Sequence, residues 1–128
     1  MGVICKMEKK DRPEELRGTT TRIKTECGNL YVIVSINGDK PYEVFAHLGK
    51  AGGCSNCQNE ALTRAITLGL RYGIPVKEFV GELEGIQCPN PTLWPKGERV
   101  LSCPDGIAKV LKGYCDDGDS SEGLHNPK

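Results

Sequence analysis

The sequence predicts an α+β domain in which a three-stranded antiparallel meander is followed by about three helices. Apolar residues alternate with polar residues in the first half of the folded region and recur at helical spacing in the second half. The pair Asn37-Gly38 separates two strand-like segments and is a strong hairpin signal. Strands that precede helices in this way are typical of an α+β fold.

The expected strands span residues 19–27, 30–36 and 42–48. In the first strand, Ile23 faces one way while Arg22 and Lys24 face the other, as in a half-buried strand. The second strand, LYVIVSI, is apolar on both faces and rich in β-branched residues. This composition favours the central position in the meander.

The expected helices span residues 56–72 and 74–86, with a last one after residue 102. Ser55 or Asn56 could cap the first helix, and Gly73 is suited to end it. Pro75 lies near the start of the second helix, and Ser102 could cap the third. The glycine-rich stretch GKAGGC therefore forms the loop before the first helix in this prediction.

Length and composition favour one soluble domain with two polar flanks. The 128 residues suit a single domain, expected at 18–115, between a flexible N-terminal arm at 1–17 and a disordered acidic tail at 116–128. Basic and acidic residues balance at 17 each, so net charge does not support nucleic-acid binding, although a local basic patch is compatible with it. We find neither a signal peptide nor a membrane-length apolar run, and we expect a cytoplasmic protein without a membrane partner.

Cysteine is the unusual component of the sequence, with seven residues. An odd number of cysteines in a reducing compartment argues against a disulfide framework. Four lie at expected element ends, a fifth forms a CxxC pair with one of these, and two lie in the flanks: Cys27, Cys54, Cys88 and Cys103; Cys57; Cys5 and Cys115. Zinc takes about four thiolates in a tetrahedron, so a zinc site built from some of these cysteines is one interpretation, although a single CxxC pair does not choose the ligands. Buried thiols without a ligand, and a redox pair at Cys54 and Cys57, are the alternatives.

The loop before the first helix could also bind an anion. Lys50, Gly52 and Gly53 precede the helix, whose free N–H groups and dipole favour a negative ligand. No known phosphate-binding motif is present, and a tight turn explains the glycines equally well. Arg64 could assist, although its simplest role is a surface ion pair with Glu60 four residues earlier. We find no complete catalytic constellation in the chain.

Five segments in order resemble the TSCPD domain: RIKTECGNLYVIVS, EVFAHLGKAGGC, EALTRAITLGLRYGI, GIQCPNP and LSCPDGIAKVL. This family occurs at the C-terminal end of adenosylcobalamin-dependent ribonucleotide reductases and as short stand-alone proteins. The resemblance covers about residues 18–113, with Leu101 in place of the first residue of the family motif. It implies an all-thiolate zinc site at the four element-end cysteines, with Cys57 as an extra thiol. The reductase barrel and its cobalamin site have no counterpart here, so that activity does not transfer.

Three functions are compatible with these features. The favoured one is a non-catalytic, zinc-stabilised module that binds or sequesters a nucleotide, with signalling nucleotides among the candidates, or another phosphate-bearing ligand. Its ligand would contact the loop at 50–53 together with Arg22, Lys24 and Arg64. The second is an accessory subunit that acts with a ribonucleotide reductase chain, and the third is a thiol oxidoreductase that uses Cys54 and Cys57. Self-association is compatible with all three.

Overall fold

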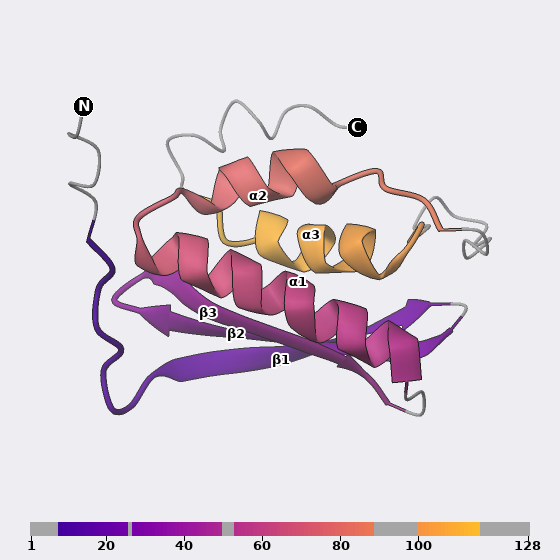
Figure 1. Cartoon of the computed structure of the whole chain (residues 1–128), viewed down its shortest axis with the longest axis horizontal. Helices are drawn as coiled ribbons and strands as arrows, with labels where there is room; N and C mark the ends of the chain where they lie inside the picture. The colour runs from indigo at the N-terminus through magenta and orange to yellow at the C-terminus, as the bar shows by residue number, and fades with distance from the viewer. Residues whose placement is uncertain (1–7, 26, 50–52, 89–99, 116–128) are drawn as a thin grey trace.

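The computed structural model describes residues 8–25, 27–49, 53–88 and 100–115. It confirms the α+β class, with three strands followed by three helices (Figure 1). The elements are β1 (Arg17–Thr25), β2 (Gly28–Asn37), β3 (Lys40–Leu48), α1 (Gly53–Arg71), α2 (Val76–Leu83) and α3 (Cys103–Lys112). Among the described residues, none of the helices has the length and apolar character needed to cross a membrane.

The three strands form one antiparallel sheet in the order β1-β2-β3, which confirms the central position of the LYVIVSI segment. Ile23 pairs with Leu30 across β1 and β2, and Val34 pairs with Val44 across β2 and β3. The turn between β2 and β3 contains Gly38 at a φ of +74°, a conformation that glycine adopts without strain. The predicted Asn-Gly hairpin is therefore present.

One face of the sheet carries the hydrophobic core, because all three helices lie on that side (Figure 1). The inward side chains of β2 and β3 are buried against apolar residues of the helices. The main buried core residues are Leu30, Val32, Val34, Val44, Leu48, Ile66, Ile107 and Leu111. The opposite face has no covering layer among the described elements, and there Phe45 keeps 47% of its surface exposed.

Two glycines allow close packing of the helices. A Cβ added to Gly69 of α1 would lie 2.5 Å from Cζ of Phe79 in α2, so these helices meet where a side chain is missing. Gly106 lets α3 approach the sheet, because a Cβ there would lie 3.3 Å from Leu30 and 3.4 Å from Ile23. The last helix thus packs back onto the first two strands.

The first helix begins three residues earlier than the sequence predicted. It starts at Gly53, so Cys54 lies within the helix rather than in the loop before it. The expected caps are not used in that way, because Asn56 bonds to β3: its Oδ1 accepts from the N–H of Leu48 at 2.8 Å. The helix ends as expected before Gly73, whose φ is +98°.

Residues preceding β1 contact the domain. The guanidinium of Arg12 pairs with the buried carboxylate of Glu43, and Tyr42 donates its hydroxyl hydrogen to the carbonyl of Asp11 at 2.8 Å. The backbone N–H of Lys10 donates to the carbonyl of Arg71 at 3.0 Å. These contacts fix residues 10–12 beside β3 and the end of α1.

Candidate metal centre

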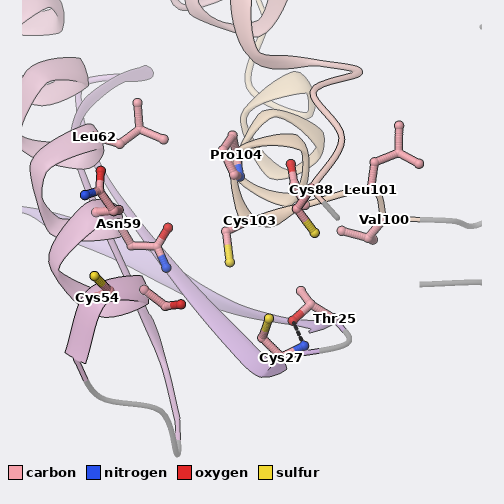
Figure 2. A pocket seen from close by; sticks show the side chains of 13 residues that line it. Thr25, Cys27, Cys54, Asn59, Leu62, Cys88, Val100, Leu101, Cys103 and Pro104 are labelled. Carbon is pink, nitrogen blue, oxygen red and sulfur yellow. Dashed lines mark hydrogen bonds between the residues drawn. The ribbon is translucent and has the colours of Figure 1, made fainter. Parts of the chain in front are cut away.

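The four cysteines at element ends line a single pocket of about 420 Å³ (Figure 2). Cys27 follows β1, Cys54 lies in the first turn of α1, Cys88 follows α2, and Cys103 is the first residue of α3. Residues that are far apart in the sequence therefore meet at one end of the domain. The family resemblance singled out these four positions, and each of them lies near an expected element end.

Backbone hydrogen bonds hold two of these cysteines in place. The N–H of Cys27 donates to Oγ1 of Thr25 at 3.1 Å, and this bond shapes the turn between β1 and β2. The N–H of Cys88 donates to the carbonyl of Leu101 at 3.1 Å. The second bond joins the segment after α2 to the segment before α3, and we call the place where they meet, which contains Cys88 and Cys103, the corner.

The polar residues of the Ser-Cys-Pro-Asp segment position Cys103. Ser102 caps α3 as predicted: its Oγ accepts from the N–H of Asp105 at 3.1 Å and donates to the carbonyl of Ile86 at 2.6 Å. Pro104 stands in the first turn, where its missing N–H costs nothing. Serine, proline and aspartate thus have roles in the local structure. Cys103 lines the pocket beside Ser102 and Pro104, and its thiol is the group of this segment that suits a metal ion.

Cys54 lies across the pocket from the other three cysteines. Figure 2 shows it on the first turn of α1, with Cys103 between it and the pair formed by Cys27 and Cys88. Cys57 is exposed and is not among the residues that line the pocket. The two thiols of the CxxC pair therefore differ in their relation to this site.

The pKa of the Cys103 thiol is raised, mainly because burial disfavours its thiolate. The nearby thiols of Cys27 and Cys88 raise it further, whereas the side-chain amide of Asn59 lowers it. The Nδ2 of Asn59 is buried and makes no hydrogen bond within the described residues. A donor held next to a thiol and lacking an acceptor fits a site in which that sulfur becomes a negatively charged, metal-bound thiolate.

As the side chains stand, the described residues contain no group of three or more histidine, cysteine, aspartate or glutamate side chains arranged to hold a metal ion. The six cysteines in the described ranges are free thiols. Four thiolates around one ion would require these side chains to move closer together. The shared pocket and the four thiols fit zinc. Binding of one ion would shorten the distances between their sulfur atoms.

Of the residues expected to contact an anion, those that the structure describes do not line this pocket. Lys50 and Gly52 lie outside the described residues, and Gly53 is the first residue of α1. Arg22 and Lys24 lie on the outward face of β1, where Arg22 is opposite Tyr31. Arg64 pairs with Glu60 at 3.3 Å in an exposed i,i+4 ion pair, as its spacing predicted.

Sequence reasoning missed the residues that complete the pocket wall. Gln58, Asn59 and Leu62 of α1 line it, together with Val100 before α3. Helical spacing from Cys54 places positions 58 and 62 on the same face, and that signal would have found two of them. Val100 had no such signal, because its place depends on how the segment before α3 returns to the sheet.

Comparison with known proteins identifies one family. The family model described as TSCPD domain matches residues 5–115. Searches of curated proteins and of solved structures give no significant match.

Proposed function

The chain belongs to the TSCPD domain family, and from that premise we propose that it is a small zinc-stabilised module that acts by binding a ligand. The observation that carries the metal part is the convergence of Cys27, Cys54, Cys88 and Cys103 on one pocket. Thiolates are preferred ligands of zinc, and a site of four of them is typical of structural zinc. Such an ion contributes directly to the free energy of folding.

A structural metal suits the core of this domain. The chain has only 5% aromatic residues, and its core is built mainly from valine, leucine and isoleucine. A bound metal ion would add to the stability that this core provides. An ion at the cysteine pocket would connect the β1–β2 turn, the start of α1, the end of α2 and the start of α3.

The ligand that we propose is a nucleotide or another phosphate-bearing molecule. The family's occurrence in enzymes that act on nucleotides supports this class by analogy. Action as an accessory subunit of a ribonucleotide reductase is the other proposal that rests on the same analogy. Co-purification with a large reductase chain would favour the accessory role over independent ligand binding.

Metal content of cysteine variants tests the zinc proposal. Protein purified without chelator should contain one zinc per chain by elemental analysis. Substitution of Cys27, Cys54, Cys88 or Cys103 by serine should each abolish stoichiometric zinc. Cys57→Ser is the matched control, because it removes a neighbouring thiol of the same helix and should leave the zinc content unchanged.

The same experiment decides on the thiol oxidoreductase alternative. A thiolate held by zinc is not free to cycle between thiol and disulfide. Stoichiometric zinc that depends on Cys54 would therefore exclude a Cys54–Cys57 redox pair. A metal-free protein that forms a reversible disulfide between these two residues would contradict the zinc proposal.

A further inference from the structure

A second cavity of about 400 Å³ lies at the end of the domain opposite the cysteines. The β2–β3 turn, the end of α1 and the start of α2 meet there, at the left of the view in Figure 1. Residue 10, which precedes β1, and Tyr114, which follows α3, also line it. Its volume is within the range of small-molecule sites.

Positive charge gathers at this cavity. Lys10, Lys40 and Lys77 come from three separate segments and line it together, with Asp39 as the acidic residue of its lining. The lining is therefore positive, although the chain as a whole is neutral. A local positive potential in a concave site favours anionic ligands.

The remaining wall is apolar and partly aromatic. Tyr42, Leu70 and Val76 are buried and line the cavity. Tyr114 is held in place by a hydrogen bond of 2.6 Å between its hydroxyl and that of Thr19. Apolar and aromatic walls beside a few charged groups suit an organic ring that carries an anionic group.

The start of α2 adds to the attraction for an anion. Val76 and Lys77 are the first two residues of this helix and line the cavity. Pro75 precedes them, and no side-chain hydrogen bond caps the helix. The positive end of the helix dipole therefore reinforces the lysines at this wall.

We propose that this lysine-lined cavity is the site at which the module binds a small organic anion of the nucleoside phosphate class. The phosphate would lie among Lys40, Lys77 and the start of α2, and the ring would lie against Tyr42 and Tyr114. The inference rests on the ligand class of the proposed function and is independent of its zinc site. It relocates the ligand from the loop at 50–53 to the far end of the domain.

Calorimetric titration with ADP, on the full chain, tests the location. The double variant Lys40→Gln/Lys77→Gln should bind ADP at least roughly tenfold more weakly than the unmodified protein, because two charge-assisted contacts to phosphate are lost. Lys50→Gln/Arg64→Gln is the matched control. It removes the same charge at the site that the sequence suggested, and its affinity should change by less than about twofold. Titration with pyrophosphate and with adenosine separates the contribution of the phosphates from that of the ring.

Two results would overturn the proposal. One is the absence of saturable ADP binding at millimolar concentration, and the other is a loss of binding confined to the Lys50/Arg64 variant. Zinc content and circular dichroism, measured on the same samples, verify folding. If the protein contains zinc but binds neither ADP nor pyrophosphate, this cavity is not the ligand site. That result would not affect the zinc proposal.

Discussion

The carboxylate of Asp105 accepts a hydrogen bond of 2.9 Å from the backbone N–H of Gly85, which joins the first turn of α3 to the turn after α2. The other carboxylate oxygen accepts from the N–H of Leu101 at 3.0 Å, and Lys109 pairs with the same group at 3.1 Å. Asp105 is fully buried. One side chain therefore holds both ends of the segment that connects α2 to α3, and it fixes the corner that contains Cys88 and Cys103.

Replacing Asp105 by alanine should destabilise the domain by about 3 kcal/mol or more, because buried N–H groups and a lysine lose their shared acceptor. Urea unfolding in the presence of chelator measures the effect without a contribution from zinc. Glu60→Ala is the control, since that carboxylate is exposed in a surface ion pair and its loss should cost less than about 1 kcal/mol. Equal effects of the two substitutions would contradict the anchoring role of Asp105.

The same carboxylate should make stability depend on pH in the acid range. Burial acts to raise the pKa of Asp105, but the N–H groups of Gly85 and Leu101 and the charge of Lys109 outweigh it, so the pKa is lowered. A lowered folded pKa means that the unfolded chain binds more protons as pH falls below about 4, the ordinary aspartate value. The stabilisation is complete above that pH and is lost as pH falls through the folded pKa.

Unfolding free energies of the unmodified protein and of Asp105→Asn, measured with chelator from pH 7 to pH 2, should therefore converge at low pH. The difference between the two proteins should be constant above about pH 5. A difference that persisted unchanged to pH 2 would show that the ionised carboxylate is not what stabilises the corner.

The strands and helices could be predicted almost completely, because the patterns that define them are local. Alternation placed the first strand, β-branched composition placed the second, Asn37-Gly38 placed the hairpin, and Ser102 placed the start of α3. The start of α1 was predicted too late, because the side chain of Asn56 is bonded to Leu48 of β3 instead of capping the helix. That bond is a tertiary contact, and single-sequence periodicity carries no information about it.

Two glycine substitutions should have opposite effects on stability. Gly69→Ala should cost about 1–3 kcal/mol, because the new Cβ would lie 2.5 Å from Cζ of Phe79. Gly81→Ala in α2 should instead stabilise by up to about 1 kcal/mol, because the added Cβ meets no atom within 4 Å and alanine favours the helix. Thermal unfolding of both variants measures these effects on stability. The double variant Gly69→Ala/Phe79→Leu tests whether a smaller side chain at position 79 relieves the clash. Destabilisation by Gly69→Ala that Phe79→Leu did not reduce would contradict this packing explanation.

Asn59 should control how tightly the cysteine pocket holds zinc. Asn59→Asp places a negative charge beside the thiolates and removes the buried Nδ2 donor, and we expect zinc affinity to fall by about tenfold to a hundredfold. Competition with a chromogenic chelator gives the affinity. Gln58→Glu is the control, because it adds the same charge on an exposed side chain of the same pocket wall. If the two variants lost equal affinity, the effect would be one of net charge.

Zinc affinity should also rise with pH across the neutral range. The pKa of the Cys103 thiol is raised by burial and by its neighbours Cys27 and Cys88, so this group is protonated in the metal-free protein at neutral pH. Binding must displace that proton, and each decrease in pH makes the displacement harder. Titrations in buffers of different ionisation enthalpy should reveal proton release on binding. Absence of proton release would contradict coordination by Cys103.

The candidate sites were less predictable than the fold. The four cysteines could be grouped because each one lies near an element end and because the resemblance to the TSCPD domain singles out these positions. The lysine-lined cavity gave no comparable signal, because Lys10, Lys40 and Lys77 are each ordinary surface charges in their own segments. They come together only in the folded domain, where residue 10, the β2–β3 turn and the start of α2 line one cavity.

The return of α3 onto β1 and β2 has a consequence for synthesis of the chain. The sheet is complete once residue 48 has been made, since each strand pairs with the next one along the chain. Cys103 is made much later and reaches the pocket only when Gly106 packs against Leu30 and Ile23. An ion held by all four cysteines would therefore be captured at the end of folding, when the last helix has left the ribosome and docked. Fully folded molecules would then contain the metal ion, whereas nascent chains would not.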